Sequence, residues 1–162
     1  MCSQAGSFFI RQSKDYNAAQ YKTYTEKNPP VYSDQDEWSM WHRIGDPVLH
    51  IELRDWADVL LIAPLSANTL GKISNGLCDN LVSCVVRAWN MQMKPLLVAP
   101  AMNTQMLNHP LTQQQMEKIK ALGVHIIAPV SKVLACGETG NGALAPVHEI
   151  VTQLKRHLAL LG

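Results

Sequence analysis

"ADVLLIAPLSANTLGKI", residues 57–73, decides the fold. Its first eight residues, 57–64, form a run that is apolar apart from Asp58 and is closed by proline, which is typical of a strand buried on both faces. The small polar residues directly after the run are favoured at the start of a helix. The stretch therefore predicts a buried strand that leads into a helix.

The same alternation continues along the chain. Apolar runs at 94–100 and 124–130 predict two further buried strands. Apolar residues at helical spacing predict helices over 66–89 with a break at Gly76, over 111–123 with Gly123 as its C-cap, and over 147–161. Strands that alternate with helices predict a three-layer, Rossmann-like α/β fold with a parallel sheet.

The first 31 residues differ from the rest of the chain in composition. They are polar, lack apolar periodicity and end in two prolines, so we expect a loosely ordered arm over 1–31 and the α/β domain over 32–162. At the start of the domain, Ser33 or Asp34 with Glu37 forms a capping-box pattern that predicts a helix N-terminus. A second short helix is expected around 50–56.

Composition narrows the classes of function. The chain has 162 residues, 47% of them apolar, and a net charge of +1, which gives no electrostatic reason to expect nucleic acid as a partner. We find no apolar segment of about 18 residues and no signal-peptide pattern, so we expect no membrane association. The four cysteines lack metal-ligand spacing. They predict reduced thiols in the cytoplasm and no metal site, with Cys78 and Cys84 buried as small apolar residues.

The predicted strands all end in a similar way. "IAPLSANT", "VAPAMNTQM" and "IIAPVSK" each leave an apolar run through Ala-Pro into polar residues. Ligands of open parallel sheets bind outside the carboxyl ends of the strands, and small polar groups at helix N-termini suit a polar cofactor or its phosphate. The sequence therefore predicts a ligand site at this edge of the sheet.

Four stretches together carry a family resemblance: "DPVLHIELRDWADVLLIAPLSANTLGKI", "GLCDNL" with "RAW", "PAMNTQM" and "LACGETGNGA". In this order they resemble the homo-oligomeric flavin-containing cysteine decarboxylases, most closely the phosphopantothenoylcysteine decarboxylase branch. The resemblance implies a lyase that binds FMN and converts 4′-phospho-N-pantothenoylcysteine to 4′-phosphopantetheine, with loss of CO₂, in coenzyme A biosynthesis. It also implies homotrimers with sites at the subunit interfaces.

The resemblance assigns two catalytic residues. His50 matches the active-site histidine of the family, and an imidazole can accept a thiol proton near neutral pH. Cys136, in a glycine-rich segment expected to act as a flap, matches the cysteine that protonates the ene-thiol intermediate. In the family, oxidation of the substrate thiol to a thioaldehyde gives the electrons of the departing CO₂ a place to go.

The binding residues come from the same motifs. Asn103 matches the asparagine that holds the substrate carboxylate, which its amide can do without a strong counter-charge. Ala101, Met102 and Met106 belong to the same substrate-binding motif, and Ser66, Ala67, Asn68 and Thr69 match the loop that contacts the flavin.

The chain departs from the family pattern in three places. The usual first strand and its phosphate-binding turn are not recognisable in residues 1–31, so we interpret the chain as a truncated form. Leu107 replaces a tryptophan, and Leu144-Ala145-Pro146 replaces Met-Ala-Glu. Two other functions remain: a catalytically impaired or regulatory, phosphatase-inhibitor-like homologue, and a flavoenzyme acting on peptides with a C-terminal cysteine.

Overall fold

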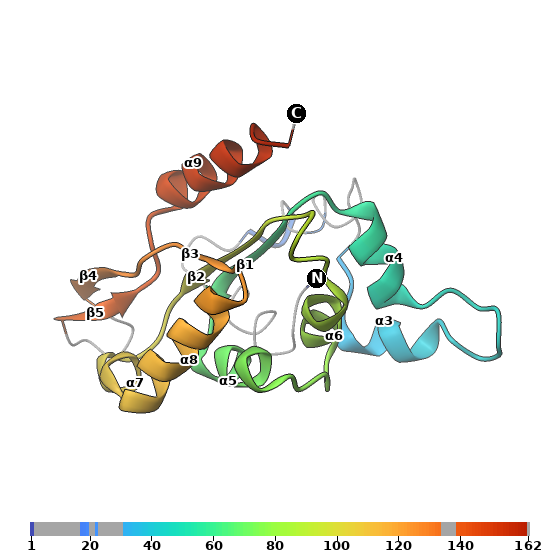
Figure 1. Cartoon of the computed structure of the whole chain (residues 1–162), viewed down its shortest axis with the longest axis horizontal. Coiled ribbons are helices and arrows are strands. Elements are labelled where there is room, and N and C mark those ends of the chain that lie inside the picture. Colours follow the sequence, from blue (N-terminus) through green and yellow to red (C-terminus); the bar gives the residue numbers. More distant parts are fainter. Residues whose placement is uncertain (2–16, 20–21, 23–30, 134–138, 162) are drawn as a thin grey trace. The chain divides into compact units, whose positions relative to one another are not determined.

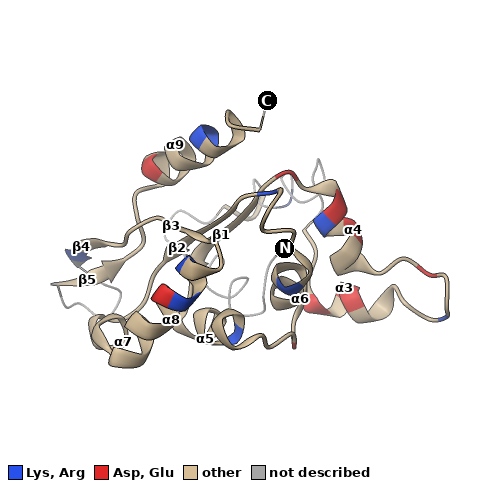
Figure 2. Ribbon diagram, in the orientation of Figure 1, with Lys and Arg blue, Asp and Glu red and all other residues tan. Residues whose placement is uncertain are grey.

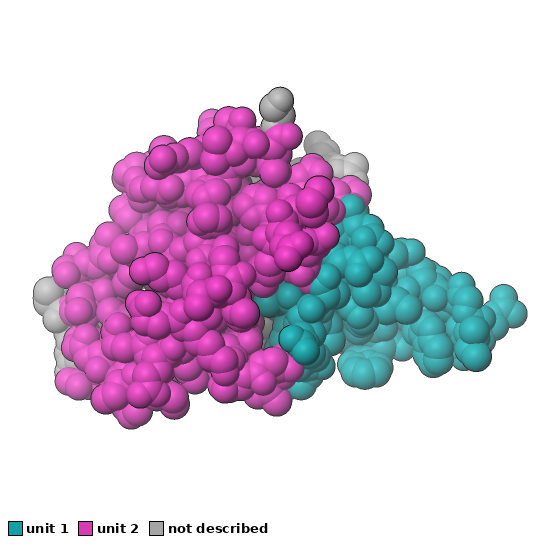
Figure 3. Space-filling view, in the orientation of Figure 1, with its two compact units in different colours: residues 1–55, 78–88 teal, residues 56–77, 89–162 magenta. Residues whose placement is uncertain are grey.

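The computed structural model describes residues 1, 17–19, 22, 31–133 and 139–161. The chain forms two compact units (Figure 3): unit 1 comprises residues 1–55 and 78–88, and unit 2 comprises residues 56–77 and 89–162. Most of the predicted arm lies outside the described residues, so the boundary between residues 31 and 32 stays a prediction.

Unit 2 is built on a parallel sheet of three strands. These are β1 (Leu60–Leu65), β2 (Leu96–Pro100) and β3 (His125–Ile126), in the order β1-β2-β3. Both strand pairs are parallel, and every residue of the central strand β2 is buried. The three apolar runs thus form the predicted sheet, although β3 is much shorter than its run.

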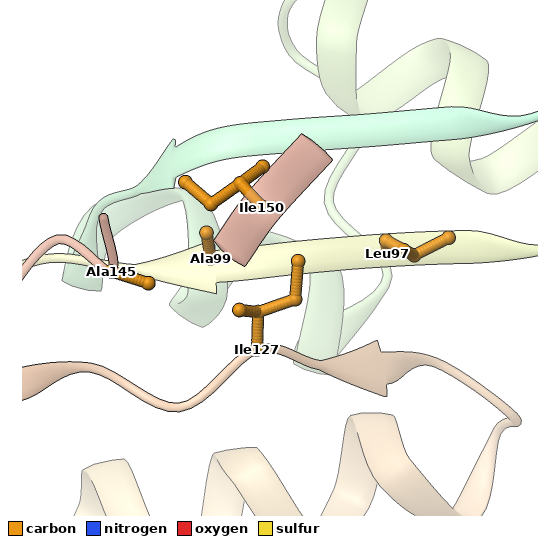
Figure 4. Close-up of a cluster of buried hydrophobic side chains, with 5 residues drawn as sticks. All are labelled: Leu97, Ala99, Ile127, Ala145 and Ile150. Atoms are coloured by element: carbon orange, nitrogen blue, oxygen red, sulfur yellow. The ribbon is translucent and has the colours of Figure 1, made fainter. Parts of the chain in front are cut away.

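Helices pack on the sheet of unit 2 from both sides (Figure 1). They are α5 (Ala67–Asn75), α8 (Pro110–Ala121) and α9 (Val147–Leu158), while α7 (Thr104–Asn108) contacts α8. Five buried side chains join the sheet to the start of α9 in one apolar cluster, Leu97, Ala99, Ile127, Ala145 and Ile150 (Figure 4). Side chains alternate along a strand, so Leu96 and Val98 face the opposite side of β2. The predicted three-layer α/β fold is confirmed.

A hairpin replaces the loop expected after the third strand. β4 (Val130–Val133) pairs antiparallel with β5 (Thr139–Ala143). Glycine has a low preference for strands, so the sequence "TGNGA" of β5 gave no strand signal. Backbone pairing joins the two strands, and Ala143 of β5 is buried.

Unit 1 contains α3 (Asp34–Ser39), α4 (Leu49–Trp56) and α6 (Leu81–Ala88). The predicted break between two helices is confirmed, because Gly76 ends α5 with a φ of 74° before α6 begins. Gly123, predicted as the C-cap of α8, instead follows the C-cap residue Leu122 and has a φ of 94°. Within the described residues, no helix is long and apolar enough to cross a membrane.

The predicted partner in the capping box of α3 is wrong by one residue. Ser33 is the N-cap, and its backbone N–H donates to Asp36 Oδ2 at 2.6 Å. Because the helix begins at Asp34, the third helical position belongs to Asp36. Asp36 therefore completes the box, and Glu37 makes its contacts elsewhere. The acidic residues of α3 are coloured red on the ribbon in Figure 2.

The surroundings of His125 predict that the stability of unit 2 depends on pH. The ring of His125 lies 4.2 Å from that of His157, centroid to centroid. Burial, followed by the charge of His157, lowers the pKa of His125. As the pH falls, His125 is therefore protonated at a higher pH in the unfolded chain than in the folded one. The free energy of unfolding should decrease below about pH 6.5 as a result.

We expect a small decrease, because His125 is exposed to water. Urea unfolding at pH 7.5 and pH 5.5 measures it, and His125→Gln should reduce the difference between the two values. An unchanged difference in the variant would show that other groups cause the pH dependence.

Candidate active site

The carboxyl ends of β1 and β2 place two of the predicted binding segments side by side. Leu65, the last residue of β1, is paired with Pro100, the last residue of β2. The backbone N–H of Ala101 donates to the carbonyl oxygen of Leu65 at 3.0 Å. The segment from Ser66 and the segment from Ala101 therefore leave the sheet at the same edge, as parallel pairing requires.

The first of these segments forms the N-terminus of α5. Ser66 is the N-cap: its Oγ accepts the backbone N–H of Thr69 at 3.2 Å and donates to Thr69 Oγ1 at 3.1 Å. Ser66 and Asn68 are exposed, while Ala67 and Thr69 are half-buried. The first turn thus presents polar groups at the end of the helix that favours negative charge.

The second segment forms the N-terminus of α7, a short helix that the sequence did not predict. Asn103 is its N-cap, and its Oδ1 accepts the backbone N–H of Gln105 at 2.8 Å. The cap is made by the oxygen of the amide, which is an acceptor, whereas the NH₂ group of an asparagine is a donor. The hydroxyl oxygen of Thr104 is buried and has no hydrogen-bond partner among the described residues.

The other residues of this segment differ in exposure. Ala101 and Met102 are half-buried, and Met106 is 50% exposed. Leu107, which stands where the family has a tryptophan, is buried, so the smaller side chain still packs inside the unit.

Strand β5 lies directly against this segment. The backbone N–H of Met102 donates to the carbonyl oxygen of Gly142 at 2.9 Å. A Cβ atom at residue 142 would lie 1.9 Å from the carbonyl oxygen of Met102, so only glycine fits there. The sequence indicated the glycines as a source of mobility; at Gly142 the structure shows a close approach of two backbones.

His50 lies in unit 1, in the first turn of α4, where one carboxylate contacts it twice. Its backbone N–H donates to Glu37 Oε2 at 3.1 Å, and its ring Nδ1 is hydrogen-bonded to Glu37 Oε1. The side chain of Glu37 is only 11% exposed and that of His50 is 26% exposed. Sequence reasoning missed Glu37, because the capping-box pattern offered a local partner for it.

Cys84, on α6, completes a cluster with these two residues. One potential ligand atom from each of Glu37, His50 and Cys84 lies within 4.8 Å of the others. Burial, and next the charge of Glu37, raise the pKa of the Cys84 thiol, which donates to the carbonyl oxygen of Cys78 at 3.3 Å.

The predicted burial of Cys78 and Cys84 can be compared with the structure. Cys84 is half-buried, but Cys78, predicted to be buried, is exposed, because it lies in the connection between α5 and α6 and not on the apolar face of a helix. Cys136 lies outside the described residues, and its catalytic role stays a prediction.

Comparison with known proteins identifies the family. A family model described as flavoprotein matches residues 1–159. A phosphopantothenoylcysteine decarboxylase of Arabidopsis thaliana is 64% identical over 115 residues, which are 71% of this chain and 54% of that protein. A second one, from Mus musculus, is 55% identical over 141 residues, which are 86% of this chain and 69% of that protein.

A solved structure agrees with these relatives. The FMN binding protein AtHal3 superposes with a TM-score of 0.75 at 55% identity, over 82% of this chain and 71% of that chain. The chain spans little more than half the length of the Arabidopsis relative. It belongs to the flavoprotein family, in the group that contains the phosphopantothenoylcysteine decarboxylases.

Proposed function

We propose that the chain is an FMN-dependent lyase of the cytoplasm that decarboxylates 4′-phospho-N-pantothenoylcysteine to 4′-phosphopantetheine in coenzyme A biosynthesis. One observation carries the proposal: the segments after β1 and β2, which the resemblance assigns to flavin and substrate, leave the sheet at one edge. The names of the relatives support the reaction and the substrate.

The residues at this edge fit a flavin nucleotide. Ser66, Ala67, Asn68 and Thr69 would hold it through the polar first turn of α5. The buried hydroxyl of Thr104, which has no hydrogen-bond partner in the part of the chain that the structure describes, is a group that a bound polar molecule would satisfy. FMN, when bound, supplies the oxidation of the substrate thiol that makes loss of CO₂ feasible. The protein supplies binding, orientation and proton transfer.

Each predicted residue has a part in this proposal. Asn103 donates its NH₂ group to the substrate carboxylate, while its oxygen keeps the cap of α7. Ala101, Met102 and the exposed side chain of Met106 form the pocket wall. His50 accepts the thiol proton, and Cys136 returns a proton to the product.

We also propose a homotrimer with the sites at its subunit interfaces, as the resemblance implies. The molar mass of the protein in solution tests this, and a monomer that releases CO₂ at a normal rate would contradict it.

Two measurements on the purified chain test the proposed function. We expect one FMN per subunit from the absorbance of the bound flavin, and release of CO₂ from 4′-phosphopantothenoylcysteine. Flavin binding without CO₂ release would instead favour the regulatory homologue, and CO₂ release only from peptides with a C-terminal cysteine would identify the other enzyme. A chain without any bound FMN would contradict the proposal as a whole.

A further inference from the structure

We propose that Glu37 is a positioning residue for His50, which it holds with a proton on Nδ1 so that Nε2 is left as the proton acceptor. The inference deepens the proposed function and rests on it, since His50 matters only as the base. The contact itself, however, is a property of unit 1 and has a test of its own.

The geometry fixes the ring of His50 from two directions. Glu37 Oε2 accepts the backbone N–H of His50, and Oε1 contacts the Nδ1 of its ring. That backbone N–H is in the first turn of α4, where a helix leaves its N–H groups without internal partners and favours negative charge. A single carboxylate therefore caps α4 and orients the side chain that α4 presents.

The direction of the ring hydrogen bond follows from the chemistry of the two groups. An ionised carboxylate only accepts hydrogen bonds, so Nδ1 must be the donor. A neutral imidazole carries a single ring proton, which the carboxylate fixes on Nδ1. Nε2 then has a lone pair for the substrate thiol, the arrangement by which a buried carboxylate prepares the histidine of a serine protease.

The neighbouring acidic residues of α3 accept hydrogen bonds from other groups. Asp36 accepts the N–H and the hydroxyl of Ser33. Asp34 Oδ1 accepts the backbone N–H of Leu81 at 3.0 Å, at the start of α6. Burial of the Glu37 side chain, 11% exposed, also shields its contact with His50 from water, which strengthens the hydrogen bond. Among the three acids of α3, Glu37 is thus the one placed to act on the ring.

Nitrogen NMR of the full chain with bound flavin and ¹⁵N-labelled histidine tests the inference directly. The His50 signals are assigned by their loss in His50→Asn. At pH 7.5 we expect a protonated Nδ1 and an unprotonated Nε2 in the wild type. In Glu37→Gln this preference should be lost, because a glutamine amide can donate to Nδ1 as well as accept from it.

Glu52→Gln is the matched control. Glu52 lies on the same helix, is exposed, and is two residues from His50, a spacing that puts two side chains on different faces of a helix. This variant should leave the His50 signals and the rate unchanged. A wild type with its proton on Nε2, or a Glu37→Gln spectrum equal to that of the wild type, would overturn the inference.

Kinetics add a second readout. Glu37→Gln should lower kcat by about 10- to 100-fold, the range found when the hydrogen-bond partner of a metal-bound histidine is removed, with little change in KM and with a shifted pH profile of kcat. Equal kcat values in Glu37→Gln and the wild type would contradict the inference. Absence of CO₂ release from the wild type would instead count against the proposed function, and the NMR result would still decide the position of the proton.

Discussion

Replacement of His50 by asparagine should lower kcat for CO₂ release by about 10²- to 10⁴-fold, the usual contribution of a general base. Asparagine has a similar size and can still donate to the carboxylate of Glu37 through its NH₂ group. The first turn of α4 should therefore stay intact. What the variant loses is a nitrogen that can accept the thiol proton near neutral pH.

The experiment compares single-turnover rates of CO₂ release from 4′-phosphopantothenoylcysteine, with the flavin absorbance as a check that the cofactor is retained. His42→Asn is the control, since His42 is an exposed histidine of the same unit that falls in none of the motifs. Its rate should match that of the wild type. If His50→Asn also turned over at the wild-type rate, His50 would have no role as the base.

The sheet of unit 2 was predictable because its strands carry two signals at once. The segments 60–64 and 96–100, which lie in β1 and β2, are apolar throughout, and each ends in Ala-Pro. A strand buried on both faces has to be apolar on both faces. Proline is the last residue of β2, whereas β1 continues one residue past its proline, to Leu65. The same pattern predicted that Ser66 and Ala101 would start from neighbouring positions, which the hydrogen bond between Ala101 and Leu65 confirms.

The hairpin and the cluster around His50 could not be predicted in this way. The pairing of β4 with β5 depends on backbone hydrogen bonds between residues with weak strand preference. Glu37, His50 and Cys84 come from three helices, and no periodicity links such distant positions. The predicted and the observed capping-box residues of α3, Glu37 and Asp36, differ by one position, which is within the ordinary uncertainty of a helix boundary.

Replacement of Gly142 by alanine should be among the most destabilising single changes in unit 2. The added Cβ would lie 1.9 Å from the carbonyl oxygen of Met102 and 3.1 Å from its carbonyl carbon. Both are backbone atoms, so no side-chain rotation relieves the clash, and β5 or the segment after β2 must move. We expect a loss of about 3 kcal/mol in the free energy of unfolding, the upper part of the range for overpacking, measured by urea unfolding.

Gly71→Ala is the matched control, because the same atom is added where there is room for it. A Cβ atom at residue 71 would lie 3.6 Å from Gln115 Nε2, an ordinary contact, and Gly71 is inside α5. Alanine there should stabilise the protein by up to about 1 kcal/mol, since glycine is costly in a helix interior. Opposite signs in the two variants would assign the loss at Gly142 to the contact with Met102. A Gly142→Ala variant as stable as the wild type would show that β5 does not approach the segment so closely.

Gly142→Ala should also weaken substrate binding, since Asn103 directly follows Met102. The KM of the Gly142→Ala protein that remains folded measures that effect.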